Sequence, residues 1–185
     1  VDLIVSNREA STVSVLINNG NGSFAAKRDY ATGVSPTGVI VADVNGDGKG
    51  DLVTANLNGM QGHGSITVLA GVGDGSFAPK VEYATGARPY FLTAADMNGD
   101  AKLDLIVASN LPSGKVSILS NNGDGSFADK VDYAAGSHPL NLTSADFNGD
   151  GKMDLAVDNY SNSSGEGTTL SVLLNTLGTL LPPDT

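Results

Sequence analysis

Three copies of one nine-residue acidic loop begin at Asp43, Asp96 and Asp146. In each copy, side chains with an oxygen donor occupy positions 1, 3, 5 and 9, a spacing that can turn them toward one point. Calcium takes about six to eight oxygens from carboxylates, amides, main-chain carbonyls and water. A loop that concentrates three Asp also repels itself unless a cation is present. The sequence therefore predicts one calcium site in each loop.

The expected ligands share these four positions, and the main-chain carbonyl of the lysine at position 7 is expected to add an oxygen. They are Asp43, Asn45, Asp47, Lys49 and Asp51; Asp96, Asn98, Asp100, Lys102 and Asp104; and Asp146, Asn148, Asp150, Lys152 and Asp154. A single cluster of Asp, Asn and Gly would more often be a plain turn, because these residues are common turn formers. Three copies with the same ligand types favour calcium.

The loops differ from EF-hands at position 12 and in the element that comes next. The EF-hand pattern requires a Glu at position 12, where this chain has Thr54, Val107 and Val157. Each loop runs directly into an apolar segment rich in β-branched residues, which predicts a strand and not a helix.

Composition indicates an all-β protein. The 185-residue chain has 24 Gly and 7 Pro among many Val, Ile, Leu and Thr residues, and no stretch keeps a helical period. It has no Cys, which excludes a disulfide scaffold and a zinc–thiolate site. Calcium is therefore the available brace for the loops.

Charge and hydropathy limit the partners. A formal net charge of −10 argues against nucleic acid or an anionic membrane, and no segment has the length of a membrane-inserted helix. No signal peptide is recognised in this chain. The segment Val1–Val5 aligns with Gly50–Thr54, so the chain is expected to begin inside a repeat, as if excised from a longer polypeptide.

A period of about fifty residues organises the chain and decides the fold. Phe24, Phe77 and Phe127 lie 53 and 50 residues apart, and a Tyr, a Pro and the first loop Asp keep the same steps. Four strand signals recur in each period. The first precedes the acidic loop (Val39–Val44, Leu92–Met97, Leu142–Phe147), the second follows it, the third alternates (Val13–Asn18, Ile66–Leu69, Val116–Ser120, Leu170–Asn175), and the fourth spans Phe24–Tyr30, Phe77–Tyr83 and Phe127–Tyr133.

Four antiparallel strands in each period describe the blade of a β-propeller. The first strand is rich in small residues, which suits the innermost position. Asn-Gly and Asp-Gly pairs between the third and fourth strands predict type I′ turns, whose two central residues have positive φ.

The expected organisation is a single repeat domain over residues 1–185 with roughly 3.5 repeats. It divides into a partial blade (1–37), two blades (38–84 and 91–133), a second partial blade (141–175) and a tail (176–185). The first partial blade lacks its inner strand and the last lacks its fourth. Such a propeller fragment could close as a small ring or form a homodimer that completes a propeller through its open edges.

The chain resembles the FG-GAP, or VCBS, repeat family, which includes the calcium-binding propeller of integrin α subunits and many secreted bacterial proteins. The resemblance covers nearly the whole chain. It rests on Asp-x-Asn-Gly-Asp-x-Lys-x-Asp, then Asn/Asp-Gly-Ser-Phe, then Tyr-Ala-Thr/Ala-Gly and Pro. It implies a β-propeller with a calcium loop between the first and second strands of each blade.

Propeller geometry places the acidic loops on one face and the most variable segments on the other. Repeats must keep what builds a blade and are free to vary what contacts a ligand, so a protein or carbohydrate ligand is expected on the face opposite the calcium loops. The variable positions are Ser35, Arg88, Tyr90, His138 and Asn141, and segments Arg8–Thr12, Leu57–Ser65 with His63, Leu111–Lys115 and Ser161–Thr168. Each residue taken singly is also consistent with a tolerant surface loop.

The sequence favours a calcium-binding module that acts as an extracellular or cell-surface adhesion or ligand-binding scaffold. Two alternatives remain: the propeller part of a secreted carbohydrate-active enzyme, and a structural spacer in an adhesin. The carboxylates recur in phase with the repeat, whereas a catalytic pair should break it. Asp158 and Glu166 are out-of-phase acids, and no positioned base stands near them in sequence, so no catalytic residue is assigned.

Overall fold

The computed structural model describes residues 1–58, 63–160, 168–176 and 179–180. Within these residues the fold is all-β, with no helix. The strands form four antiparallel sheets of three or four strands and one two-stranded ribbon. The expected all-β, blade-based architecture is confirmed.

Each sheet is a meander of consecutive strands. The first contains β1 (Leu3–Asn7), β2 (Thr12–Leu16) and β3 (Arg28–Ala31); the second β4 (Val34–Ala42), β5 (Asp51–Asn58), β6 (Gly64–Leu69) and β7 (Val81–Gly86); the third β8 (Pro89–Ala95), β9 (Asp104–Ser109), β10 (Lys115–Leu119) and β11 (Val131–Ala134); the fourth β12 (Pro139–Ala145), β13 (Asp154–Asn159) and β14 (Thr169–Leu173); and the ribbon β15 (Asn175–Thr176) and β16 (Thr179–Leu180). These sheets are called blades 1 to 4 in chain order.

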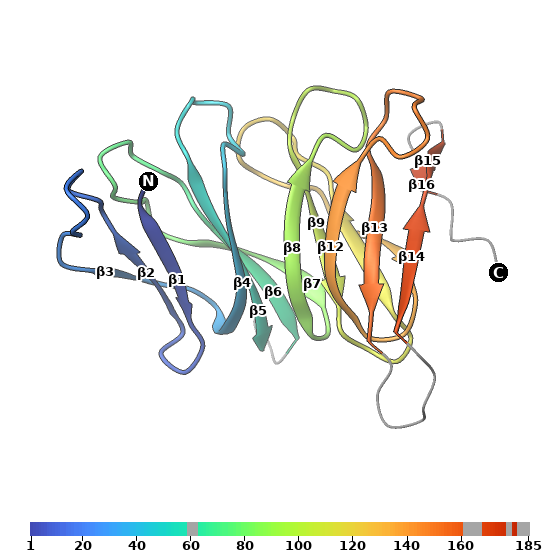
Figure 1. The fold of residues 1–185 in the computed structure, drawn as a ribbon, viewed down its shortest axis with the longest axis horizontal. Helices are drawn as coiled ribbons and strands as arrows, with labels where there is room; N and C mark the ends of the chain where they lie inside the picture. The colour runs from blue at the N-terminus through green and yellow to red at the C-terminus, as the bar shows by residue number, and fades with distance from the viewer. Residues whose placement is uncertain (59–62, 161–167, 177–178, 181–185) are drawn as a thin grey trace.

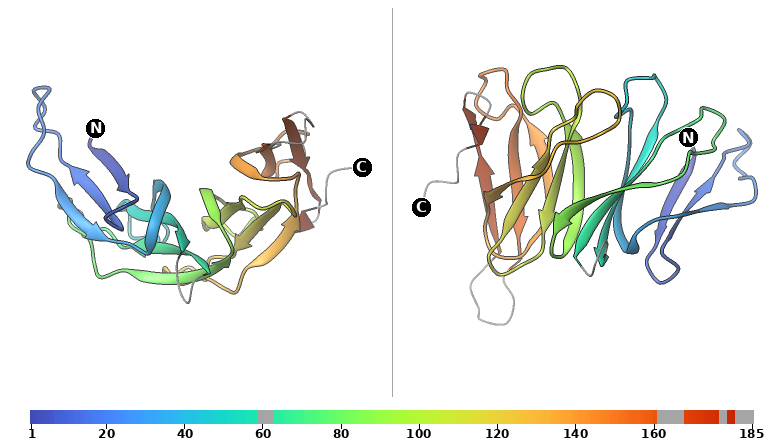
Figure 2. Two further views of the ribbon diagram at one scale, coloured as in Figure 1. Left: turned by 90° about the horizontal axis from the view of Figure 1, so that it is seen from below. Right: turned by 180° about the vertical axis from the view of Figure 1, so that it is seen from behind.

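The four blades fan around a common centre and form an open crescent with blades 1 and 4 at its ends (Figure 2). Strands β4, β8 and β12 line the concave side, as expected for the small-residue strand, while β3, β7 and β11 lie on the convex side. The acidic loops project from one end of the strands, and the β1–β2 turn lies at the other end (Figure 1). The two expected faces are therefore present.

The hydrophobic core lies between the blades. Three clusters of buried residues join blade 1 to blade 2, blade 2 to blade 3, and blade 3 to blade 4. The second strand of a central blade contributes to both of its interfaces, so all six residues of β9 are buried. Burial on both faces explains why these strands are continuous apolar runs, in which alternation is not expected.

A repeated aromatic contact packs blade 1 against blade 2 and blade 2 against blade 3. Tyr30 packs edge-to-face on Phe77 with ring centroids 5.1 Å apart, and Tyr83 packs on Phe127 at 5.4 Å. Such pairs add about 0.5–1.5 kcal/mol beyond the burial of their area. The Tyr30 hydroxyl also donates to the carbonyl of Gly75 at 3.2 Å. The recurring Phe and Tyr of the sequence therefore belong to the joints between blades.

Two of the predicted strand types need correction at their ends. The inner strands begin earlier than expected, because Val34, Pro89 and Pro139 already pair with the second strand, before a bulge. The fourth strands are shorter: Phe24 makes only an isolated bridge to Asn18, and the regular pairing starts several residues later.

The type I′ turn prediction is wrong. Gly20 and Gly22 have positive φ angles of 84°, but Asn21 between them does not. The loop is closed instead by Asn19 N–H donating to the carbonyl of Ser23 at 3.0 Å, and the Asn21 side-chain oxygen accepts from Ser23 N–H at 3.0 Å. An Asx turn of this kind uses the same residue types as a tight hairpin.

Candidate metal centre

Each acidic loop connects the inner strand of a blade to its second strand at a fixed register. Ala42 pairs with Asp51, Ala95 with Asp104 and Ala145 with Asp154. The sheet therefore clamps both ends of every loop, and the three loops share the same starting geometry.

The first Asp of each loop organises the main chain around its carboxylate. Asp43 Oδ1 accepts from Gly46 N–H at 2.8 Å and Asp47 N–H at 3.2 Å, while Oδ2 accepts from Gly48 N–H at 2.8 Å. Asp96 and Asp146 make the same three bonds in their loops. Each carboxylate oxygen can accept more than one bond, so position 1 still has oxygen valence for a cation.

Positions 3 and 5 repeat a simpler pattern. Asn45 Oδ1 accepts from Asp47 N–H at 2.9 Å, and Asp47 Oδ1 accepts from Lys49 N–H at 2.9 Å. The Lys49 ammonium lies 3.4 Å from Asp47 Oδ2. The other two loops have the same lysine–aspartate pair, so the lysine side chain partly offsets the charge at position 5.

The conformation requires left-handed backbone at positions 4 and 6. Gly46 and Gly48 have φ angles of 74° and 79°, a region that residues with a Cβ rarely adopt. The second loop has Ala101 at position 6 with φ 65°. The loop geometry therefore imposes the same backbone even where the residue disfavours it.

The Asp at position 9 differs from the other three. Asp51, Asp104 and Asp154 are fully buried. Asp51 Oδ2 accepts from Val44 N–H at 3.0 Å, and Oδ1 accepts from Gly71 N–H at 2.8 Å. This carboxylate thus connects the acidic loop to the start of the hairpin between the third and fourth strands.

The hydrogen bond from the hairpin main chain to the position-9 carboxylate recurs in the other loops. Asp104 Oδ1 accepts from Asn121 N–H at 2.9 Å, and Asp154 Oδ1 accepts from Asn175 N–H at 2.7 Å. Asp2, which aligns with Asp51 in the incomplete first repeat, accepts from Asn18 N–H at 2.8 Å. The position-9 Asp therefore has a structural role in joining the loop to the hairpin. The spacing of residues in the sequence did not distinguish this role from metal ligation.

Electrostatics differ between the first and last positions of a loop. The N–H of Gly151 is the main group that lowers the pKa of Asp146, which favours the ionised, ligating form. Burial raises the pKa of Asp104, and the charges of Asp100 and Asp96 act in the same direction. A bound cation would offset this repulsion.

The donor chemistry fits a hard cation, although the carboxylates are not gathered in advance. Within the described residues, no group of three or more His, Cys, Asp or Glu side chains is arranged to hold a metal ion. The loops nevertheless offer only oxygen donors, with positions 1, 3 and 5 at the surface or partly exposed. These residues, together with the position-9 Asp, would hold a calcium ion, and its charge would neutralise the loop.

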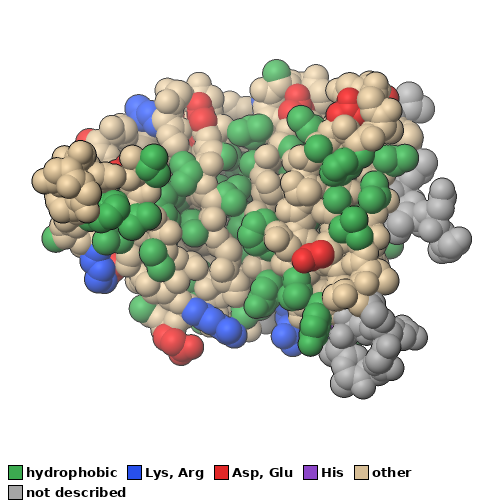
Figure 3. All heavy atoms as spheres, viewed as in Figure 1, with side chains coloured by type: hydrophobic (Ala, Val, Ile, Leu, Met, Phe, Trp, Pro, Cys, Tyr) green, Lys and Arg blue, Asp and Glu red, His purple; other side chains and the backbone are tan. Residues whose placement is uncertain are grey.

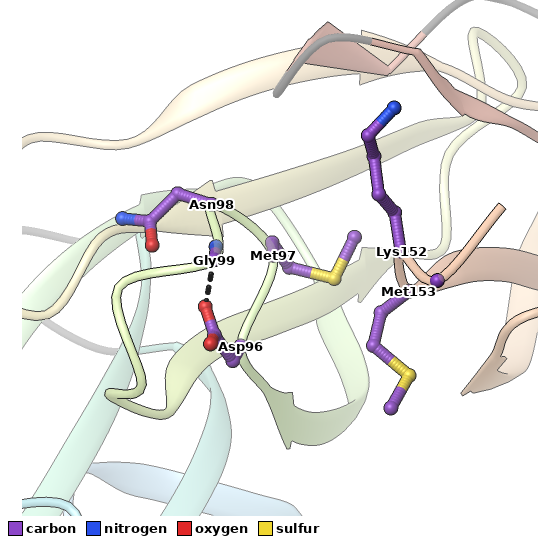
Figure 4. Close-up of a pocket in the computed structure, with 7 residues that line it drawn as sticks. Asp96, Met97, Asn98, Gly99, Lys152 and Met153 are labelled. Atoms are coloured by element: carbon purple, nitrogen blue, oxygen red, sulfur yellow. Dashed lines mark hydrogen bonds between the residues drawn. The ribbon is translucent and has the colours of Figure 1, made fainter.

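Clefts separate the acidic loops of neighbouring blades. The cleft between blades 3 and 4 has a volume of about 400 Å³, and Figure 4 shows Asp96, Met97 and Asn98 on one side and Lys152 and Met153 on the other. An equivalent cleft of about 190 Å³ lies between blades 2 and 3. The spaces between the loops therefore follow the repeat.

Asparagines beside these clefts are joints between blades that sequence reasoning missed. Asn121 Nδ2 donates to the carbonyl of Val44 in the preceding blade at 2.8 Å, and Asn175 Nδ2 donates to that of Met97 at 2.7 Å. An asparagine stands at this repeat position in Asn18, Asn121 and Asn175 but is replaced by Gly71 in the second repeat, and this partial recurrence was the available signal. Because an acidic loop is the acceptor in both cases, the loop conformation is coupled to the joint between blades.

The opposite face holds the variable residues. Ser35, Arg88 and His138 have φ angles of 58°, 56° and 51°, so the shared position has left-handed backbone whatever its side chain. Tyr90 and Asn141 are exposed.

The out-of-phase acid Asp158 lies within the described residues. Asp158 Oδ1 accepts from Asn141 N–H at 2.5 Å, while Glu166 and most of the segment Ser161–Thr168 lie outside the described residues.

A family model supplies the remaining observation. The model described as FG-GAP-like repeat matches residues 1–54, 51–107 and 96–157. The chain belongs to this family. FG-GAP repeats build β-propeller-like modules and are typical of extracellular proteins. A search of curated proteins found no match. In the described part of the chain, no helix is long and apolar enough to cross a membrane.

Proposed function

We propose that this FG-GAP repeat protein is a calcium-stabilised propeller module that serves as an extracellular binding or adhesion scaffold. The observation that carries the proposal is the threefold recurrence of one loop conformation. In each copy an Asp gathers three main-chain amides, and the oxygen donors at positions 3 and 5 are partly or fully exposed. A loop that served only as a turn would not need oxygen donors at the same four positions in all three copies.

Calcium would act on the blade frame. Its ligands at positions 1, 3 and 5 lie in the loop, and position 9 is also bonded to the hairpin, so one ion would connect the inner strand, the second strand and the hairpin. Extracellular modules of this chemistry bind calcium with Kd values of about 10⁻⁴ to 10⁻³ M. Such sites fill outside a cell and are empty in cytosol.

Thermal unfolding in calcium and in chelator tests the metal part of the proposal. At about 10 mM Ca²⁺ each site should stabilise the fold by about 1.4–2.7 kcal/mol, because binding to the native state alone contributes RT ln(1 + [L]/Kd). Asp100→Ala should remove one site's share of the calcium-dependent shift. Asp129→Ala, which changes an exposed acid outside the loops, should leave the whole shift in place. A midpoint that is the same in calcium and in chelator would refute the proposal.

A further inference from the structure

A cleft on the face opposite the acidic loops brings two arginines together. It has a volume of about 250 Å³ and is lined by Arg8, Leu57, Asn58 and Arg88. Arg8 lies in the β1–β2 turn of blade 1, Leu57 and Asn58 end β5 of blade 2, and Arg88 precedes β8 of blade 3. Segments far apart in sequence thus contribute one binding surface.

The charge of this cleft is uncompensated. All seven lysines of the chain form ion pairs with Asp or Glu. In the described residues Arg8 and Arg88 form none, and no acidic residue lines the cleft. Figure 3 shows Lys and Arg side chains, together with an acidic side chain, along the lower rim, whereas acidic side chains prevail along the upper rim. With two free guanidinium groups, the cleft is positively charged in a protein whose net charge is −10.

Both arginines depart from the repeat. The residues equivalent to Arg88 in the other blades are Ser35 and His138, and those equivalent to Arg8 include Leu57 and Asn110. The blade frame therefore requires neither charge. Two independent departures that meet in one cleft indicate recognition of a ligand.

The main chain at Arg88 is held in place. Its φ angle is 56° and its carbonyl accepts from Asn110 N–H at 2.9 Å. Pro89 follows it and is buried, and proline restricts the backbone on both sides of the peptide bond. The guanidinium group thus extends from an ordered base, which reduces the entropy lost on binding.

We propose that this cleft binds a small ligand with one carboxylate, of the size and chemistry of a sugar acid. Arginine presents a planar fork that matches a carboxylate with two parallel hydrogen bonds. Leu57 offers an apolar surface for the C–H face of a pyranose ring, and the Asn58 amide offers a donor and an acceptor for hydroxyls. The overall negative charge disfavours a polyanion. The ligand expected is a hexuronate within an otherwise neutral glycan.

This inference rests on the binding-scaffold part of the proposed function and names its ligand class. The probe is D-galacturonate, titrated into the calcium-loaded full chain and followed by NMR shifts. A ligand with as few non-hydrogen atoms as this sugar acid should bind with a Kd in the millimolar range. The neutral sugar D-galactose should bind at least about tenfold more weakly, because it lacks the carboxylate.

Two variants test the arginines without disturbing the fold. Arg88→Ser places the residue of blade 2 at a backbone position that Ser35 already tolerates, and Arg8→Gln removes a charge from an exposed turn. Each should weaken D-galacturonate binding by about ten- to a hundredfold, the value of a charge-assisted hydrogen bond. Arg28→Gln removes an equal charge on β3, outside the cleft, and should change the affinity less than about twofold.

Besides the absence of any D-galacturonate binding, three outcomes would overturn the inference. They are equal binding of D-galactose, unchanged affinity in the Arg8→Gln/Arg88→Ser double variant, and tighter binding of N-acetyl-L-glutamate, which would assign the cleft to acidic peptides. The calcium-dependent melting shift is measured on the same samples. A full shift with no sugar-acid binding rejects the cleft alone, whereas arginine-dependent binding with no shift rejects the calcium proposal alone.

Discussion

At the residue scale, the second acidic loop holds an alanine in a left-handed backbone conformation that alanine rarely adopts. Position 6 is Gly48 in the first loop and Gly151 in the third, with φ 79° and 82°, but Ala101 in the second, with φ 65°. Left-handed backbone costs a residue with a Cβ about 1–2 kcal/mol. The three hydrogen bonds to the Asp96 carboxylate hold this conformation against that cost.

Replacing this alanine should therefore stabilise the protein. Ala101→Gly is expected to raise the free energy of unfolding by about 0.5–1 kcal/mol, because relief of strain exceeds the added entropy of the unfolded chain. Gly48→Ala is the reciprocal variant and should lower it by about 1 kcal/mol, since an added Cβ meets no atom within 4 Å and the penalty is conformational. Urea unfolding in chelator measures both. Equal stabilities for Ala101→Gly and the parent protein would contradict the argument.

At the scale of elements, the outer strands of blades 1 to 3 carry a repeated ionic motif. Lys27 pairs with Asp29, Lys80 with Glu82, and Lys130 with Asp132. A serine of the third strand also donates to each acid, as Ser117 Oγ does to Asp132 at 2.7 Å. The motif compensates for short outer strands, because β3 and β11 have only four residues each.

The outer-strand motif should lose its effect in acid. Burial raises the pKa of Asp132, but hydrogen bonds from Lys130 and Ser117 outweigh it and lower the pKa below 3.8. A lowered pKa gives stability that is present above the unfolded-state pKa and is lost as the pH falls through the folded-state value. Asp132→Asn should therefore destabilise the fold by about 1 kcal/mol at neutral pH and progressively less below about pH 4.

Unfolding midpoints of the parent and of Asp132→Asn between about pH 7 and pH 2.5 measure this difference. Asp129→Asn, which alters an exposed acid close in sequence, should show no such pH dependence. A difference for Asp132→Asn that stayed constant to the acid end of this range would exclude the ionic explanation.

The elements also show which features local sequence can predict. The blade frame followed from the fifty-residue period, and the acidic loops from the spacing of their oxygens, because both are local patterns. The Asn121 bond to the Val44 carbonyl joins residues 77 positions apart, and although the asparagine recurs, nothing in the spacing of either segment indicates which residue is its partner. The second role of Asp51 was missed for the same reason, since its partner Gly71 is 20 residues away.

At the scale of the whole molecule, the crescent presents a blade face at each end that resembles its own buried interfaces. Leu170 of blade 4 is 66% exposed, whereas the equivalent Ile66 of blade 2 is fully buried. In blade 1, Leu3 is 46% exposed, and the equivalent Leu52 is fully buried. The two ends carry opposite sides of the same interface, so a second copy of the chain offers each end a complementary surface.

The chain is therefore expected to self-associate through these ends. Light scattering should show a mass that rises with concentration, because an uncovered interface of this kind favours burial in water. Leu170→Asp should shift the protein toward the monomer by introducing a charge into the interface. Val81→Asp changes an equally apolar residue, 52% exposed on the outer strand β7, and should leave the association unchanged. A mass that stays monomeric at every concentration would show that a second copy does not cover these faces.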